Sequence, residues 1–134
     1  MEEIRVGEYI RTKNGVIAQF THIETYYKDK IYWFDNTIYQ DYEENISYLR
    51  DNNLEKYIKK HSFNIIDLIE VGDYVNGYRV VEIMEDMKTG EIHLEMTSDY
   101  TNQEIGDCTI YNKDIKTIVT KEMMASVEYK VEAN

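Results

Sequence analysis

The chain has 134 residues, of which 43% are hydrophobic and 13% aromatic, a composition that excludes a disordered chain. Its formal net charge of -11, from 26 acidic and 15 basic residues, argues against direct nucleic-acid binding, because neutralising phosphates needs a basic footprint. No apolar run reaches the roughly 18 residues of a membrane span and the first residues lack signal-peptide regions, so we expect a cytoplasmic protein without membrane contact.

Two stretches of the chain share one pattern. Residues 6–10, VGEYI, match residues 71–75, VGDYV, and an Asn-Gly pair follows each of them, at 14–15 and at 76–77. Asn and Gly tolerate the positive φ that the type I′ turn of a two-residue hairpin requires. A β-rich segment follows each pair, so the sequence predicts that both halves of the chain open with a hairpin.

Further elements are expected after these hairpins. Residues 30–35, KIYWFD, have the aromatic and β-branched side chains typical of a strand. Residues 36–61 interrupt the β pattern and are interpreted as an insert, in which Asp51 or Asn52 caps one short helix. In the second half, residues 90–96, GEIHLEM, alternate apolar and polar side chains, which predicts a strand with one buried face.

Both halves are expected to close in the same way. Ser62 and Thr120 stand where an N-cap would start one turn of helix, and an extended segment is expected after each. A lone hairpin is marginal in water, so each sheet is expected to curl until its ends are covered or paired. We therefore predict a mainly β chain of two tandem small barrels, at 1–68 and 69–134, joined directly through a closing strand at 65–70.

One resemblance supports this architecture. The stretch VGEYIRTKNGVIAQF, residues 6–20, resembles the opening of KOW and SH3-like small barrels, and VGDYVNG resembles it more briefly. The resemblance implies two SH3-like barrels with short helical turns. Nucleic-acid-binding members have a basic strand here, whereas only Arg11 and Lys13 keep that character and the second copy has neither.

A second resemblance concerns the setting of the protein. The stretch KKHSFNIIDLIEVGDYVNGYRVVEI, residues 59–83, followed by IVTKE at 118–122, is similar to small proteins of Firmicutes phages, prophages and integrative elements. The resemblance implies a mobile-element origin, in which small acidic proteins often act by binding host proteins. It brings no catalytic residues with it.

The sequence offers no constellation of catalytic or metal-binding residues. His22, His61 and His93 are far apart, none has a second ligand at metal spacing, and His93 is expected to be exposed. Cys108, the single cysteine, lacks a partner for a disulfide or a CxxC motif and is expected to be a small buried hydrophobe. We therefore expect no cofactor, metal, small-molecule ligand or enzymatic activity. An enzyme that uses Cys108 or a carboxylate pair is a third alternative.

Aromatic side chains concentrate in the first half. Strand alternation points Tyr32 and Phe34 to one face and Trp33 to the other. These rings either pack under the insert, because a small core needs large residues, or form a protein-binding patch, because tyrosine and tryptophan favour interface cores. The candidate protein-binding residues are Tyr26, Tyr27, Tyr32, Trp33, Phe34, Tyr39 and Tyr42.

Two functions follow from these patterns. The leading hypothesis is a non-enzymatic interaction module of phage or mobile-element origin that binds a protein partner, or itself, through the aromatic residues. In the alternative, carboxylates of the second half imitate phosphates and block a host nucleic-acid-binding or defence protein. The candidate acidic residues are Glu82, Glu85, Asp86, Glu91, Glu95 and Asp99.

Overall fold

The computed structural model describes residues 3–40, 47–97 and 104–125. The fold is mainly β, and the chain divides into two compact units, Met1–Asn64 and Ile65–Asn134, each with a five-stranded antiparallel sheet. The division falls slightly before the expected boundary at 68/69. No helix in the described ranges is long and apolar enough to cross a membrane.

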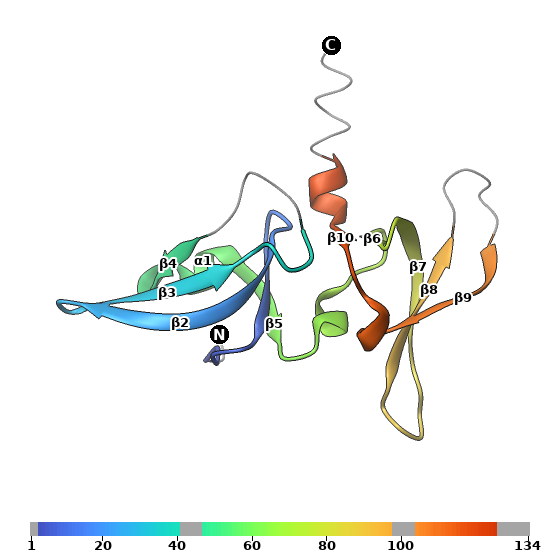
Figure 1. Cartoon of the computed structure of the whole chain (residues 1–134), viewed down its shortest axis with the longest axis horizontal. Coiled ribbons are helices and arrows are strands. Elements are labelled where there is room, and N and C mark those ends of the chain that lie inside the picture. Colours follow the sequence, from blue (N-terminus) through green and yellow to red (C-terminus); the bar gives the residue numbers. More distant parts are fainter. Residues whose placement is uncertain (1–2, 41–46, 98–103, 126–134) are drawn as a thin grey trace, which may run out of the picture. The chain divides into compact units, whose positions relative to one another are not determined.

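The first unit is a sheet with the strand order β4-β3-β2-β1-β5. Its elements in chain order are β1 (Tyr9–Thr12), β2 (Ile17–Tyr26), β3 (Asp29–Asp35), β4 (Tyr48–Arg50), the 3-10 helix η1 (Asp51–Asn53), α1 (Leu54–Tyr57) and β5 (Ile58–Ser62). Strands β2 and β3 form a long hairpin whose closed end extends past β4 (Figure 1).

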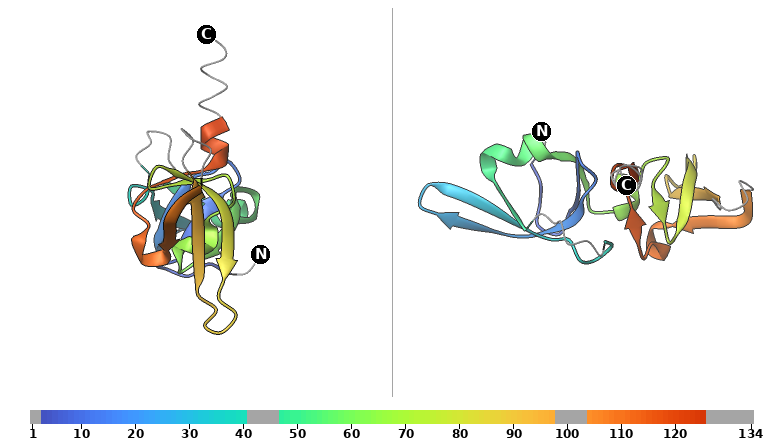
Figure 2. Two further views of the ribbon diagram at one scale, coloured as in Figure 1. Left: turned by 90° about the vertical axis from the view of Figure 1, so that its right-hand side faces the viewer. Right: turned by 90° about the horizontal axis from the view of Figure 1, so that it is seen from above.

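The second unit repeats this order as β10-β6-β7-β8-β9. Its elements are η2 (Ile65–Leu68), β6 (Tyr74–Val75), β7 (Tyr78–Glu85), β8 (Ile92–Thr97), β9 (Glu104–Tyr111), η3 (Asn112–Asp114), β10 (Ile118–Val119) and a helical turn at 121–125. The β7–β8 hairpin forms the corresponding arm, which Figure 2 shows from two further directions. Strands β6 to β10 therefore correspond in order to β1 to β5.

The matching stretches of sequence adopt matching conformations. Gly7 has a φ of 99° and Gly72 a φ of 98°, in the left-handed region that favours glycine. Each glycine then donates its N–H across to the second strand of its unit, Gly7 to the carbonyl of Phe20 at 2.8 Å and Gly72 to that of Val80 at 2.9 Å. The sequence repeat is thus a repeated turn.

The acidic residue after each glycine holds the turn together. The N–H of Arg5 donates to Glu8 Oε2 and that of Glu70 to Asp73 Oδ2, both at 2.7 Å. Glu8 is 7% exposed and Asp73 is 0% exposed. A buried carboxylate that accepts backbone N–H groups satisfies donors that the tight turn would otherwise leave unpaired. We call Glu8 and Asp73 the turn carboxylates.

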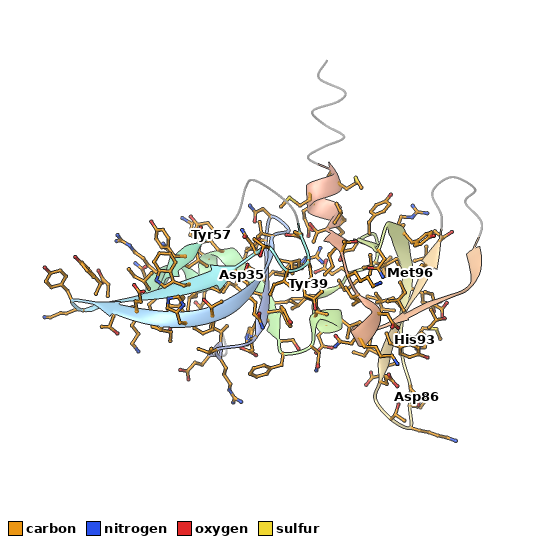
Figure 3. The ribbon with its side chains drawn as sticks, in the orientation of Figure 1. Asp35, Tyr39, Tyr57, Asp86, His93 and Met96 are labelled. Carbon is orange, nitrogen blue, oxygen red and sulfur yellow. The ribbon has the colours of Figure 1, made fainter. Side chains whose placement is uncertain are left out.

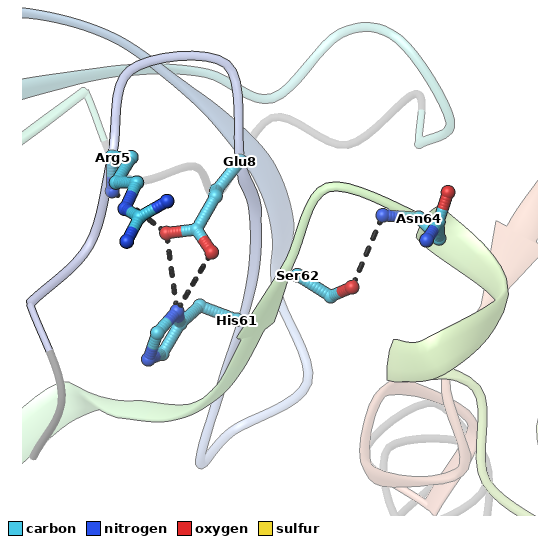
Figure 4. Close-up of polar contacts among 5 residues, drawn as sticks. All are labelled: Arg5, Glu8, His61, Ser62 and Asn64. Atoms are coloured by element: carbon cyan, nitrogen blue, oxygen red, sulfur yellow. Dashed lines mark hydrogen bonds and ion pairs between the residues drawn. The ribbon is translucent and has the colours of Figure 1, made fainter.

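Each turn carboxylate also reaches the end of its own unit. His61 Nδ1, on β5, lies 3.1 Å from both oxygens of Glu8 and donates to them, because a carboxylate only accepts (Figure 4). In the second unit the N–H of Lys121 donates to Asp73 Oδ1 at 2.9 Å. The first and last segments of each sheet are therefore tied through one carboxylate.

The expected Asn-Gly hairpins form, but only one has the expected turn. In the second unit Asn76 and Gly77 both have positive φ, 52° and 87°, between the paired residues Val75 and Tyr78, so the type I′ prediction is confirmed. In the first unit only the glycine is left-handed, and its N–H bonds to the carbonyl of Thr12. The extra residues there lengthen the loop, so the type I′ geometry is not needed.

The prediction of an insert at 36–61 is wrong. Within this range lie the strand β4 and most of β5, with the predicted short helix reduced to the single turn Leu54–Tyr57. The predicted closing strand at 65–70 is also wrong, because Ile65–Leu68 is the 3-10 helix η2 and β5 precedes it. Adjacent residues of this apolar run are both buried, as Ile65 and Ile66 show. In a strand with one solvent-exposed face, every second side chain would be exposed.

In the second half the strands expected after Asn76-Gly77 and at 90–96 form, whereas β9 and β10 were missed. The alternation at 90–96 is confirmed by β8, in which Leu94 and Met96 are fully buried. Strand β9 was not predicted, because its sequence EIGDCTIY has no simple alternation. Thr120 caps the turn at 121–125 as expected, accepting the N–H of Met123, whereas Ser62 accepts the N–H of Asn64, which precedes η2.

Each unit has its own apolar core. In the first, the ring of Phe20 packs on those of Tyr32 and Phe34, with centroids 5.2 and 5.7 Å apart. In the second, Leu94 and Met96 from β8 and Ile118 from β10 are fully buried. Burying each such side chain contributes about 1.5–3 kcal/mol. Across the described ranges neither sheet is closed, since its two end strands do not pair with each other.

The two Asn-Gly pairs give a matched stability test. The side chain of Asn76 accepts the N–H groups of Lys116 and Thr117 and donates to the carbonyl of Asp114, so it fastens the turn to the chain before β10. Asn76→Ala is expected to lower the free energy of unfolding by about 2 kcal/mol, because these bonds and the left-handed preference are lost.

The measurement is urea unfolding followed by circular dichroism, with Asn14→Ala as the control. The control is expected to cost less than about 0.5 kcal/mol, because Asn14 accepts only from the hydroxyl of Thr12. Equal losses in the two variants would show that the side-chain bonds of Asn76 do not hold the turn.

Candidate protein-interaction surface

Strand alternation divides the predicted aromatic patch between two faces. Tyr32 and Phe34 are only 6% and 8% exposed and belong to the core, so for these two candidates the packed alternative holds and not the protein-binding patch. The Tyr32 hydroxyl donates to Asp51 Oδ1 at 3.1 Å. Burial, with this hydrogen bond, raises the pKa of Tyr32 above its usual range. Trp33 lies between them in β3 and faces the opposite side of the sheet.

On that opposite face three rings line up across three strands. Trp33 is paired with His22 on β2 and with Tyr48 on β4. The His22 ring is parallel to the indole within 6°, with centroids 6.0 Å apart, and the Tyr48 ring lies 5.4 Å from it on the other side. His22 and Tyr48 are exposed and Trp33 is half-buried. We call these three residues the ring row.

The same positions in the second unit carry different chemistry. Both units have a register shift in the second strand, between Phe20 and His22 and between Val80 and Glu82. Counting from this shift, the ring row corresponds to Glu82, Glu95 and Thr109, which are likewise paired across β7, β8 and β9.

We call Glu82 and Glu95 the carboxylate row. Glu82 on β7 stands directly opposite Glu95 on β8. Glu95 Oε1 accepts the hydroxyl of Thr109 at 3.3 Å and lies 3.2 Å from His93 Nε2. Cross-strand carboxylates repel each other, so this pair does not serve the stability of the sheet.

A hollow of about 600 Å³ adjoins the ring row at Tyr48. Its lining residues are Asn14, Ser47, Tyr48, Leu49, Arg50, Asn53 and Tyr57. A second hollow of about 220 Å³ shares Arg50 and is lined also by Lys28, Asp29, Lys30, Asp51 and Asn52. The first volume falls within the range of about 300–1,000 Å³ that ligand sites occupy. Tyr57, at the end of α1, is labelled in Figure 3.

Two other predicted aromatic residues lie at the closed end of the β2–β3 hairpin. Tyr26 is 66% exposed and Tyr27 is 90% exposed, and their rings meet edge to face with centroids 5.0 Å apart. Tyr27 has a φ of 57°, which is rare for a bulky side chain. These two rings are exposed but are not part of the ring row.

The remaining predicted aromatics are Tyr39 and Tyr42. Tyr39 is half-buried after β3, with its ring edge to face against that of Tyr9 at 5.5 Å (Figure 3). Burial, with a hydrogen bond to Tyr9, raises the pKa of Tyr39 to about 12. Nearby, the hydroxyl and then the N–H of Thr37 bond to Asp35 and lower the pKa of that carboxyl. Tyr42 lies outside the described residues.

The predicted acidic residues lie mostly along the β7–β8 arm. Glu82, Glu85, Asp86 and Glu91 are exposed and Glu95 is half-buried, whereas Asp99 lies outside the described residues. Asp86, at the end of the arm in Figure 3, accepts the N–H groups of Lys88 and Thr89, which lower the pKa of its carboxyl. Asp86 therefore also caps the hairpin turn.

Arg11 and Lys13 are the two basic residues of the stretch that resembles KOW barrels, and the structure gives them different surroundings in the first unit. Arg11 is 0% exposed, and Lys13 Nζ donates to the carbonyl of Glu55 at 3.1 Å. Arg11 is therefore not available to neutralise phosphates from the surface of β1, whereas Lys13 is exposed.

The histidines are distributed as separate pairs. His22 and His93 each lie beside the glutamate two residues further on, Glu24 at 3.4 Å and Glu95 at 3.2 Å. His93 is half-buried, so the prediction that it is exposed is wrong. Among the residues with described positions, no three His, Cys, Asp or Glu side chains gather as a metal site. Cys108 lies in β9, but its side chain is outside the description.

No protein-family model, curated protein or solved structure matches the chain. The candidate site therefore depends on its geometry: a row of three rings, a hollow beside it and a cation at their border. Such a surface offers contact area and charge rather than a reactive group. The sequence patterns missed His22 and Arg50, because only the strand register places them beside Trp33 and the hollow.

The pKa of Tyr39 gives a test of its burial. The folded-state pKa of about 12 lies above the usual tyrosine pKa of 10.0, so folding favours the neutral phenol. The stabilisation is complete below pH 10 and is lost as the pH rises towards 12. Urea unfolding of Tyr39→Phe is therefore expected to show a weaker fall in stability over this range than the wild type. An unchanged fall would mean that Tyr39 is not held as a buried phenol.

Proposed function

We propose that the chain is a non-enzymatic protein-interaction module of phage or mobile-element origin, built from two SH3-like units. The SH3-like assignment is supported by the shared order of five antiparallel strands, and by the short helical turns before the last strand of each unit, at η1–α1 and at η3. The mobile-element origin is supported by the sequence resemblance alone.

The ring row carries the binding part of this proposal. His22, Trp33 and Tyr48 occupy outward positions, where the core gains nothing from large rings, yet they pack against each other across three strands. Aligned rings lose little side-chain entropy when a partner covers them, and tryptophan and tyrosine dominate the energetics of protein interfaces. The proposed partner is a protein, or a second copy of this chain.

The test compares the full-length wild type with Trp33→Ala by affinity capture with quantitative mass spectrometry, and by light scattering for self-association. Trp33→Ala is expected to weaken the complex at least about thirtyfold, since a central tryptophan is worth about 2 kcal/mol or more. Tyr111→Ala is the control, because this tyrosine is an aromatic residue of β9 in the second unit and lies outside the ring row. A wild type that stays a lone monomer and captures nothing, with Trp33→Ala no different, would contradict the proposal.

A second candidate function is favoured by the carboxylate row. Glu82 opposite Glu95 is unfavourable for the sheet, and the neighbouring arm adds the exposed Glu85 and Glu91. In this alternative the second unit imitates phosphates and occupies a basic nucleic-acid channel of a host or defence protein.

Salt separates the two candidate functions. A complex made by the carboxylate row is expected to weaken steeply as salt rises to about 0.5 M, where the screening length falls below about 5 Å. It is also expected to weaken in the double variant Glu82→Gln and Glu95→Gln and to be unaffected by Trp33→Ala. Affinity that persists at high salt in this double variant would rule out the phosphate-mimic function.

A further inference from the structure

One edge of strand β4 is not paired with another strand of the described residues. Within the described residues β4 is the end strand of its sheet and pairs only with β3. The N–H of Phe34 donates to the carbonyl of Ser47 at 2.9 Å, so the backbone groups of Ser47 and, two residues on, Leu49 point towards β3. By the same alternation the backbone N–H groups of Tyr48 and Arg50 point away from the sheet.

The larger hollow lies along this strand. Residues 47–50 line it continuously, and the rest of its lining comes from Asn14 in the β1–β2 loop and from Asn53 and Tyr57 in η1 and α1. As far as its residues are described, the first sheet is not closed, since β4 and β5 do not pair. The hollow therefore leaves room beside an unpaired backbone edge, which is the geometry used by proteins that add an extended peptide as a further strand.

The side chains around the hollow indicate what such a peptide carries. Tyr48 and Tyr57 are 52% and 41% exposed and offer aromatic surface. Among the described residues that line the larger hollow, Arg50 is the charged one. It also borders the smaller hollow, where Lys28 and Lys30 lie with Asp29 and Asp51, so cations outnumber carboxylates there. An arginine in this position favours a carboxylate, which it can bind through two parallel hydrogen bonds.

We propose that an extended peptide pairs with β4, with an aromatic or large aliphatic residue opposite Tyr48 and an aspartate or glutamate opposite Arg50. Tyr48 and Arg50 are two residues apart on one face of the strand, so the two peptide residues are separated by one position. The apolar residue then extends the ring row beyond Tyr48, as cross-strand aromatic pairs do. This inference rests on the proposed binding function and names the partner chemistry.

The second unit supplies an internal control for this chemistry. The positions on β9 that correspond to Tyr48 and Arg50 hold Thr109 and Tyr111, as their pairing with Glu95 and His93 shows. This strand offers no cation at the position of Arg50, so the same peptide is not expected to pair there.

The first experiment selects displayed random peptides against the full-length chain. Enriched peptides are expected to carry an apolar residue and an Asp or Glu at a spacing of two, and Arg50→Glu is expected to replace the acidic residue with Lys or Arg. Peptides without this spacing, a preference unchanged by Arg50→Glu, or no enrichment at all would each overturn the inference. An absence of enriched peptides overturns this inference but not the proposed function, provided that Trp33→Ala still weakens the capture of a folded partner.

The second experiment tests the backbone pairing with one selected peptide. Arg50 has a φ of -81°, which proline tolerates, and its N–H does not belong to the β3–β4 ladder. Arg50→Ala removes the arginine side chain with its charge and keeps the backbone N–H, whereas Arg50→Pro removes both the side chain and the N–H. Arg50→Pro is expected to bind about threefold to tenfold more weakly than Arg50→Ala, the effect of one hydrogen bond. Equal affinities of the two variants would overturn strand pairing.

Folding of both variants is checked by circular dichroism. Should Arg50→Pro unfold, hydrogen exchange of the wild type replaces it. The Tyr48 amide is expected to become protected when the peptide is added, because it points towards the new strand. An amide of Tyr48 that exchanges equally fast with and without saturating peptide would contradict the inference.

Discussion

The structure depends on a buried carboxylate that directly follows a left-handed glycine. Glu8 and Asp73 each accept the backbone N–H of the residue three positions earlier, and each is tied to the last part of its own unit, through His61 or through the N–H of Lys121. A buried charge is costly unless it is paired, so these bonds fix where the first strand starts and where the sheet ends. The repeated sequence is the signature of this constraint.

Above this shared frame the two units carry different outward residues. Positions that face away from the core do not affect its packing, so one frame holds three rings in the first unit and two opposed carboxylates in the second. The proposed functions follow from this difference. The ring row, the hollow and Arg50 suit an extended partner with an apolar and an acidic residue, whereas the carboxylate row suits a basic one.

Much of the frame is predictable from sequence, because the signals are local. The Gly-acid turns, the Asn76-Gly77 hairpin and the alternation in β8 each depend on a few adjacent residues. The apolar run at 65–70 led to a wrong prediction of a strand, since consecutive buried residues fit a 3-10 turn as well as a strand. The ring row was not predictable, because a register shift between Phe20 and His22 decides which residue stands opposite Trp33.

Residue-resolved hydrogen exchange of the full-length chain tests the central claim most directly, with Glu8→Ala and Asp73→Ala compared with the wild type. If each carboxylate holds its own unit, Glu8→Ala speeds exchange at the amides of Gly7 and Phe20, and Asp73→Ala does so at those of Gly72 and Val80. Exchange that is unchanged in both variants, or that rises equally in both units in each, would contradict the account.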